Sequence, residues 1–375
     1  MRFGPRLLTF LVVAILAASA LLIAACGNDD DSGADDPGTG NGDDTAATDT
    51  PADDTDVSEG DRADASGSIT VYSGRSEELI GPIIDRFEED TGIQVNVRYG
   101  DTPELAATIL EEGSNTPADV YIAQDAGSLG LLANENMLAA IPGDILGRVG
   151  TEYRAENDTW VGLSGRARVV AYNTEMVDPD ELPGSILDFT DPEWEGRIGW
   201  APTNASFQSF VTGLRVVEGE DTAREWLEGI RANNPREYPN NTSTVEAVAS
   251  GEVEVGFVNH YYLFRFLEER GEEFESRNYY FEDGDIGGLM NVAGTAILQN
   301  TDNQLAAERF IEYMLEEEAQ DYFATETFEF PLVTGVEVSF DVPALGDLDP
   351  VAIDLTDLED LRGTIELLQE TGVLP

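Results

Sequence analysis

Two spacings of apolar residues alternate along the chain after residue 67. Ile83 and Phe87 recur at helical spacing, whereas the segment before them is short and rich in β-branched and aromatic side chains, as strands are. Alternation of this kind predicts a largely parallel sheet covered on both faces, with ligands at the carboxyl ends of its strands. The predicted strands of this part are residues 68–73, 93–99 and 120–123, and the predicted helices are 77–90 and 103–112.

The same style continues to the C-terminal part of the chain. No period of the kind that marks a solenoid is visible. The segment from residue 68 to residue 375 is too long for one ordinary core, so we expect an α/β fold of two lobes. Further strands are predicted at 160–172, 197–201, 254–258 and 294–298, and further helices at 205–218, 222–231 and 304–318.

The N-terminus has the pattern of a targeting segment. Arg2 and Arg6 precede an apolar run over 7–23, and small residues then lead to Cys26, the single cysteine of the chain. This pattern resembles a bacterial lipoprotein signal, in which the cysteine becomes the lipidated first residue. A simple transmembrane anchor is the alternative, because the run is about 17 residues long, close to a membrane span. We expect residues 1–26 to be a signal peptide and Cys26 to carry the lipid.

Residues 27–67 are predicted to be a disordered tether. They contain 14 acidic residues and a single arginine, with almost no apolar bulk. Such a composition has no core to offset the entropy of ordering, and its like charges extend the segment. The tether is expected to hold the folded part away from the membrane.

The charge of the folded part excludes several partners. Residues 68–375 carry 61 acidic residues and 17 arginines, and the chain has no lysine. This surface repels nucleic acid and anionic lipid headgroups, so we expect no nucleic-acid partner and contact with a membrane through the lipid anchor alone.

The residues needed for common hydrolytic sites are scarce. The chain has one histidine, His260, and its one cysteine is predicted to be lipidated, so Ser–His–Asp and Cys–His sites have little material. No pair of carboxylates stands out among the many acids. We therefore expect a binding protein and not an enzyme.

Five segments in order resemble the bacterial periplasmic ferric-ion-binding proteins. The opening strand with its turn resembles the family's first strand, and Trp160 begins a segment like its "WV.LSGR.RVV" strand. The most specific likenesses are Pro202-Thr203 and the pair Tyr261-Tyr262 after Asn259. The matching segments are 69–74, 87–95, 111–120, 160–170 and 202–203 together with 259–262.

The resemblance implies a solute-binding component of an ATP-driven (ABC) importer, working with its permease and ATPase subunits. It implies a type II periplasmic-binding-protein fold, in which each lobe is a mixed, mostly parallel sheet flanked by helices and a ligand cleft lies between the lobes. We expect hinge strands near 164–172 and 290–298, lobe 1 from 68–165 plus 297–375, and lobe 2 from 166–296. A monomer outside the cytoplasm, anchored to the cell membrane by lipid, is expected.

The family resemblance also implies Fe(3+) ligands. Hard phenolate oxygens suit this ion, and a trivalent cation favours the phenolate form strongly. Tyr261 and Tyr262 match the family's ligand pair, with a packed aromatic role as the alternative. Both can reach one ion only if the strand before them ends there, because neighbours in a strand point to opposite faces. Tyr172, at the end of a hinge strand, is a third candidate, and Tyr72 is expected to pack.

One well-known arrangement of the family is absent here. Its first-lobe His and Glu correspond to Ser76 and Gln124, which are poor ligands for Fe(3+). Glu77 and Asp125 are the candidate substitutes, with ordinary solvated or helix-start carboxylates as the alternative. We expect His260, next to the pair, to be partly solvated.

A small anion, carbonate or phosphate, is expected to complete the coordination. Arg75 lies where carbonate-using branches of the family place an arginine, and Asn241 and Asn259 match positions near the anion. At least one of Arg166 and Arg168 is expected to pair with surface acids. A predicted helix N-terminus offers backbone N–H groups to the same anion, at Asn204, Ala205 and Ser206.

The closest alternative keeps the fold and changes the cargo. Related folds bind thiamine-like compounds, other organic cations or oxyanions. In that case Tyr261 and Tyr262 would be stacking surfaces for a cation and not metal ligands.

Overall fold

The computed structural model describes residues 59–375 except 337, 339, 341, 344, 346, 347 and 349. The predicted signal segment with Cys26, and residues 27–58 of the predicted tether, lie outside the described residues. Among the residues that are described, no helix combines the length and the apolar character needed to cross a membrane.

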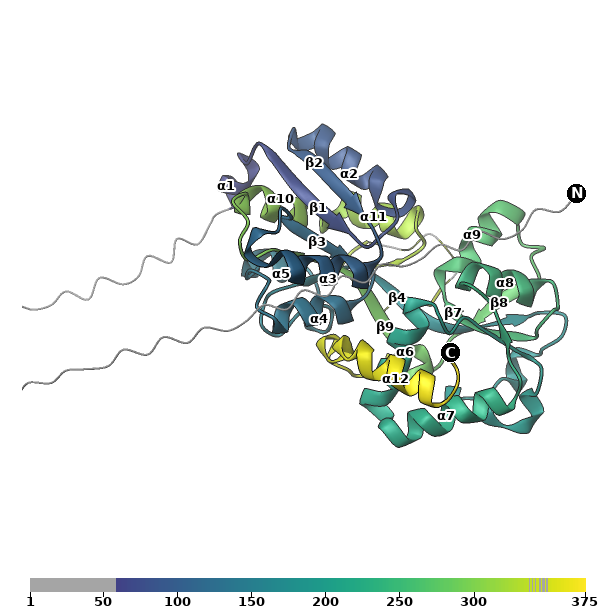
Figure 1. Ribbon diagram of the computed structural model, residues 1–375. Coiled ribbons are helices and arrows are strands. Elements are labelled where there is room, and N and C mark those ends of the chain that lie inside the picture. The colour runs from purple at the N-terminus through teal and green to yellow at the C-terminus, as the bar shows by residue number, and fades with distance from the viewer. Residues whose placement is uncertain are drawn as a thin grey trace, which may run out of the picture. The chain divides into compact units, whose positions relative to one another are not determined.

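Helices and strands alternate through most of the chain (Figure 1). The helices are α1 (Glu59–Ala63), α2 (Glu77–Thr91), α3 (Thr102–Glu112), α4 (Ala126–Asn134), α5 (Gly143–Leu146), α6 (Ala205–Glu218), α7 (Glu220–Ala232), α8 (Asn241–Ala249), α9 (Tyr261–Arg270), α10 (Gln304–Met314), α11 (Glu317–Thr325) and α12 (Leu361–Glu370). The strands are β1 (Ser68–Ser73), β2 (Gln94–Tyr99), β3 (Val120–Ala123), β4 (Val161–Asn173), β5 (Ile198–Trp200), β6 (Arg236–Glu237), β7 (Val255–Asn259), β8 (Ser276–Tyr279), β9 (Met290–Ile297) and β10 (Phe330–Pro331).

The predicted helix over 304–318 is two helices, α10 and α11. The chain breaks because Glu316 adopts an extended conformation before α11 begins. The carbonyl of Met314, left free at the end of α10, accepts a hydrogen bond from the Gln320 side chain at 2.9 Å. A buried side chain of α11 therefore satisfies the end of α10, which apolar spacing alone does not reveal.

Strand β4 joins the two lobes. Its first half pairs antiparallel with β9 in the sheet of lobe 1, and its second half pairs antiparallel with β7 and β8 in the sheet of lobe 2. The strands of the predicted alternating units are parallel, as in β1 with β2 and β3, and β5 with β6 and β7. The fold is therefore α/β with mixed sheets, and the strands that cross between lobes supply the antiparallel pairs.

The division between lobes differs from the predicted one at two places. All of β9 pairs with β3 or β4 in the sheet of lobe 1, so this sheet already includes residue 290 and not only residues from 297. The C-terminal helix α12 lies beside α6 (Figure 1), and its Leu367 and Leu368 are buried in the core of lobe 2. The apolar face of α12 is buried against lobe 2. The position of this helix along the chain does not determine which lobe it packs against.

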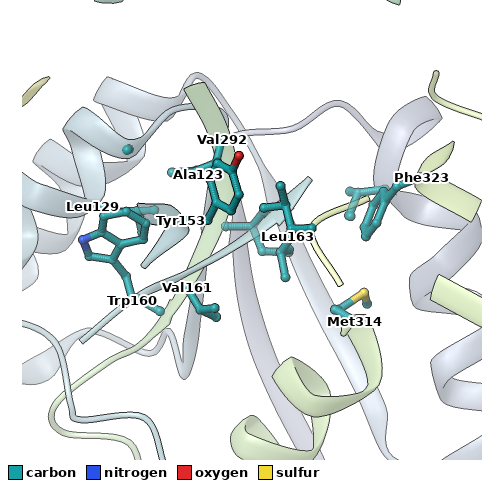
Figure 2. Close-up of a cluster of buried hydrophobic side chains, with 14 of the residues drawn as sticks. Ala123, Leu129, Tyr153, Trp160, Val161, Leu163, Val292, Met314 and Phe323 are labelled. Carbon is teal, nitrogen blue, oxygen red and sulfur yellow. The ribbon is translucent and has the colours of Figure 1, made fainter. Parts of the chain in front are cut away.

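The core of lobe 1 surrounds the start of the crossing strand. Leu163 of β4, Val292 of β9 and Tyr153 belong to one buried cluster (Figure 2). Trp160, at the entry to β4, is fully buried in the same cluster. This packing holds the first half of β4 rigidly, so that the residues at its midpoint leave lobe 1 in a defined direction.

The end of the predicted tether is ordered. Residues 59–63 form α1, and the side chain of Arg62 has no exposed surface. Its guanidinium contacts Asp144 and lies 3.3 Å from the Glu312 carboxylate. The prediction of disorder up to residue 67 is therefore wrong for residues 59–67, because this arginine finds carboxylate partners on α5 and α10.

Candidate functional site

The two adjacent tyrosines lie at a change from strand to helix. Strand β7 ends at Asn259 and α9 begins at Tyr261, so Tyr261 and Tyr262 are the first two residues of a helix. Neighbours on a helix lie about 100° apart and not on opposite faces. The two rings accordingly stack at a centroid distance of 4.2 Å and an interplanar angle of 27°. Strand β7 therefore ends before the pair, as is required for Tyr261 and Tyr262 to contact one ligand.

Tyr261 is held in its neutral form without a cation. It is 2% exposed, and burial, followed by the neighbouring Tyr262, raises the pKa of its phenol well above the ordinary value. The charge of Arg166 acts in the opposite direction on this pKa. A hard cation that replaced the phenol protons would therefore bind with proton release.

Two arginines lie at the midpoint of β4, where the strand passes from one sheet to the other. Arg166 pairs with Asn291 of β9, and Arg168 pairs with Asn259 at the end of β7. The Arg168 guanidinium donates to the Asn259 side-chain oxygen at 3.0 Å, and burial lowers its pKa to about 9. Arg168 therefore stays charged at neutral pH although its partner is a neutral amide.

Arg166 is the less satisfied of the two. It is buried, and its Nε and Nη1 atoms make no hydrogen bond to any described residue. Its charge lowers the pKa of Asp125, Tyr261 and Glu329. Neither Arg166 nor Arg168 pairs with a surface acid among the described residues, so that expectation is wrong for both.

Arg75 has a carboxylate partner of its own. Its Nη1 donates to Glu329 Oε1 at 3.0 Å, and its Nη2 lies 2.9 Å from Oε2. Ser164 donates to the same carboxylate at 2.8 Å and Thr327 at 3.2 Å. Burial opposes ionisation of Glu329, but Arg75 and these bonds hold its pKa below the ordinary value. The fork of Arg75 is thus already filled, although the sequence predicted an anion there.

The other predicted anion residues form two groups. Asn204 caps α6 by accepting from the Ser206 N–H at 3.1 Å, and Asn241 donates to the Ser206 hydroxyl at 3.1 Å. Ala205, the first residue of α6, is exposed between Asn204 and Ser206. Asn259 forms the second group, because its side-chain oxygen accepts a hydrogen bond from Arg168. The buried Oδ1 of Asn241 accepts no bond from the described residues. Helix α6, which begins at the first group, also contacts the second group, because the Arg168 guanidinium lies over the Phe210 ring of α6 at 5.5 Å.

The two candidate carboxylates of lobe 1 have different surroundings. Glu77 is exposed in the first turn of α2, and its charge contributes, after burial, to a raised pKa at Tyr99. Asp125 caps α4 by accepting from the Ser128 N–H at 3.3 Å, and burial raises its pKa while Arg166 opposes that effect. Asp125 therefore shares a charged neighbour with Tyr261, whereas nothing connects Glu77 to the tyrosine pair.

Tyr172 does not lie with the pair. It is four residues beyond Arg168 on β4, a separation of about 13 Å in a strand. It pairs with Val255 at the start of β7, and it lines a cavity with Arg277 and the distal part of α9. The structure thus brings Tyr261 and Tyr262 together with the arginines and leaves Tyr172 apart. Tyr72 packs as predicted, with its hydroxyl 3.2 Å from the Glu112 carboxylate.

His260 is fully buried, so the expectation of a partly solvated histidine is wrong. Its Nδ1 accepts from the Ala167 N–H at 3.2 Å, and its ring stacks on Phe330 at 4.5 Å. Burial lowers its pKa to about 3. A neutral ring with Nδ1 as acceptor links the start of α9 to β4 and β10.

Glu329 was not identified from the sequence. The available signal was a single acid between two aromatic residues, Phe328 and Phe330, in an apolar segment. Among the described residues no group of three or more His, Cys, Asp or Glu side chains is arranged to hold a metal.

Known proteins resemble this chain over most of its length. A family profile described as bacterial extracellular solute-binding protein matches residues 115–348. The Fe(3+)-binding periplasmic protein of Serratia marcescens is 31% identical over 314 residues, which cover 83% of this chain and 92% of that protein.

Solved structures show the same likeness. Iron-bound HitA from Pseudomonas aeruginosa has 33% sequence identity and a TM-score of 0.77, covering 81% of this chain and 99% of the other. Trichodesmium IdiA (FutA), in complex with iron and citrate, has 28% identity and a TM-score of 0.73, covering 82% and 99%.

Proposed function

The chain belongs to the bacterial extracellular solute-binding proteins, and from this membership we propose that it captures ferric iron between its lobes and delivers it to an ABC importer. Relatives of this chain are named as ferric-iron-binding and periplasmic. Their names support iron as the cargo and a location outside the cytoplasm.

The tyrosine pair carries this proposal. Two phenol oxygens at the start of α9 meet the need of Fe(3+) for hard anionic donors, and their rings are already stacked at 4.2 Å. Iron displaces both phenol protons, and the positive charge of the ion then stabilises the two negatively charged phenolate oxygens. The raised pKa of Tyr261 means that affinity grows as pH increases, because the competing protons become scarcer.

The charge of the site requires a synergistic anion. Arg166 and Arg168 are both buried and form no close ion pair among the described residues, so a trivalent ion nearby would face two guanidiniums. A carbonate or phosphate between the arginines and the iron removes this repulsion and supplies further oxygen ligands. Asn204, Ser206 and Asn241 at the start of α6 supply polar groups for it, together with Asn259 beside Arg168. In this assignment Arg166 replaces Arg75, whose fork Glu329 fills.

Asp125 is the proposed ligand from lobe 1. It is the candidate carboxylate with a charged neighbour in common with Tyr261. A ligand from each lobe on one ion draws the lobes together, as in hinge closure around a bound solute. The closed form then presents both lobes to the permease. Lipidation at Cys26 would keep this monomeric carrier near the importer by holding it on the membrane surface.

The test is the visible absorption of the purified protein during titration with Fe(3+) in the presence of carbonate or phosphate. A phenolate-to-iron charge-transfer band is expected. In the Tyr261→Phe, Tyr262→Phe double variant, which keeps both rings, the band should vanish and affinity should fall by more than about 100-fold, since loss of a group outside the ligand shell alone costs about 10–100-fold.

Tyr172→Phe serves as the matched control and should leave the band in place. An unchanged iron titration in the double variant would overturn the proposal. Binding of an organic cation that is lost in the double variant, with no band in the wild type, would favour the alternative cargo.

A further inference from the structure

A second cavity lies along α9, beyond the tyrosine pair. It has a volume of about 560 Å³, within the range of small-molecule sites. Neither Tyr261 nor Tyr262 lines it. Its walls come from α9 beginning at Leu263, from β4, from β8 and the residues beside it, and from the segments before and after β10.

Aromatic and charged side chains both contribute to the walls of this cavity. Tyr172, Phe264, Tyr280 and Phe328 line it, and the rings of Phe264 and Phe328 lie 6.2 Å apart with their planes tilted by 34°. Phe328 has a φ of 57°, a left-handed conformation that is uncommon for a bulky side chain. Such strain persists where the surrounding structure enforces it, and it clusters at ligand sites.

The mouth of the cavity carries excess negative charge. Glu268 and Glu272 are exposed among the lining residues, and Glu268 forms no ion pair within the described part of the chain. Arg277 offers little to an anion, because its Nη2 lies 3.1 Å from the Glu272 carboxylate and its Nη1 donates to two backbone carbonyls at 2.7 Å. The cavity is therefore suited to a cation.

One acceptor in the lining is unused. Asn278 donates through Nδ2 to the backbone carbonyl of His260 at 2.8 Å, which fixes the orientation of its amide. Its buried Oδ1 accepts no bond from the described residues. A ligand with a hydroxyl or N–H group would satisfy this oxygen.

We propose that this cavity binds a small organic cation, an alkylated ammonium that carries a hydroxyl group. The aromatic walls attract the cationic head through their ring faces, as in known recognition of quaternary ammonium groups. Glu268 adds charge attraction at the mouth, and Asn278 orients the hydroxyl. The tyrosine pair does not line this cavity, although Tyr262 packs against the cluster that contains Phe264 and Phe328, so variants are needed to distinguish the two sites.

The test uses isothermal titration calorimetry of the full-length protein in a neutral detergent. The probes are choline and 3,3-dimethylbutan-1-ol, the neutral analogue with carbon in place of nitrogen. Choline should bind saturably and at least about tenfold more tightly than the neutral analogue, because only the cation gains from the rings and from Glu268. Equal affinity for the two probes, or no heat of binding with choline, would overturn the proposal.

Variants separate this site from the iron site. Glu268→Gln should weaken choline binding several-fold without changing the neutral probe, whereas Glu269→Gln, one residue along the same helix and outside the lining, should have no effect. Tyr172→Leu should remove most choline binding and leave the iron titration unchanged. If Tyr172→Leu instead abolishes iron binding and spares choline, Tyr172 is an iron ligand and the proposed cavity site is wrong.

Discussion

The two arginine centres near the crossing strand differ in how their charge is satisfied. Arg75 faces Glu329 through two close N–O pairs at 3.0 and 2.9 Å, and Ser164 also donates to that carboxylate. Among the described residues, Arg75 and Arg166 each have two nitrogens without a hydrogen-bond partner, but Arg75 faces a carboxylate at close range, whereas Arg168 bonds a neutral amide. A buried charge without a partner is costly, and proteins rarely retain one without a use.

This difference distinguishes a structural ion pair from a ligand site. The Arg75–Glu329 pair ties the β1–α2 turn to the segment before β10 within lobe 1, and each charge has its counter-charge within the pair. At the centre of β4, Arg166 has two nitrogens without a partner among the described residues, and Arg168 lies over the Phe210 ring of α6. A close carboxylate, present at Arg75 and absent from Arg166 and Arg168 among the described residues, separates the structural pair from the candidate anion ligands.

The largest effect is expected from breaking the satisfied pair. Glu329→Gln leaves Arg75 buried without its counter-charge, so the free energy of unfolding should fall by about 3–5 kcal/mol. Urea denaturation followed by circular dichroism measures this change. The Arg75→Met, Glu329→Leu double variant should recover most of the loss, and a single variant as stable as the wild type would contradict a structural role.

A smaller loss of stability is expected for the second centre. Arg166→Met removes a buried charge that forms no close ion pair with a described residue, although Asp125 and Glu329 lose its attraction, so the ligand-free protein should be destabilised less than in Glu329→Gln. Iron affinity in the presence of carbonate or phosphate should fall by about 10–100-fold, because the anion loses its counter-charge. Titration at several anion concentrations measures the effect.

Arg265→Met supplies the control for this variant, since that arginine is exposed on α9. It should change neither stability nor affinity. If Arg166→Met destabilises the free protein as strongly as Glu329→Gln does, the distinction between the two centres fails.

A smaller effect should separate the two carboxylates of lobe 1. Asp125→Asn keeps an acceptor for the Ser128 N–H but removes the charge, and iron affinity should fall by about tenfold or more. Glu77→Gln, at an exposed helix start, should leave affinity unchanged. Competition for iron with citrate measures both, and the reverse order of effects would assign the ligand to Glu77.

The smallest change is expected at His260, the single histidine. Its folded pKa of about 3 lies below the ordinary value of about 6.5, so the buried neutral ring stabilises the fold fully above pH about 6.5. This contribution is lost progressively as pH falls from 6.5 toward 3. Proton NMR should show one histidine ring signal that does not titrate between pH 7 and about 5. A midpoint near pH 6 would show that the ring is solvated.

Local pattern predicted much of the fold. The predicted bounds of β1, β3 and α6 match the structure residue for residue, because each has a clear apolar period between definite end signals. The tyrosine pair and the end of the strand before it were also predictable, since both depend on residues adjacent in sequence. Amino-acid composition alone led us to predict the acidic surface, the tether and the scarcity of residues for common hydrolytic sites.

Contacts between distant segments decided the rest. Sequence alone did not show that Glu329 would meet Arg75, 254 positions away, or that Arg166 would remain without hydrogen bonds at two of its nitrogens. Tyr172 has the residue type of a ligand, but register on β4 places it four residues beyond Arg168. Arg62 was predicted to lie in a disordered segment, but it forms ion pairs with Asp144 of α5 and Glu312 of α10. Residue type determines which chemistry a side chain can perform, and packing determines which partners remain within reach.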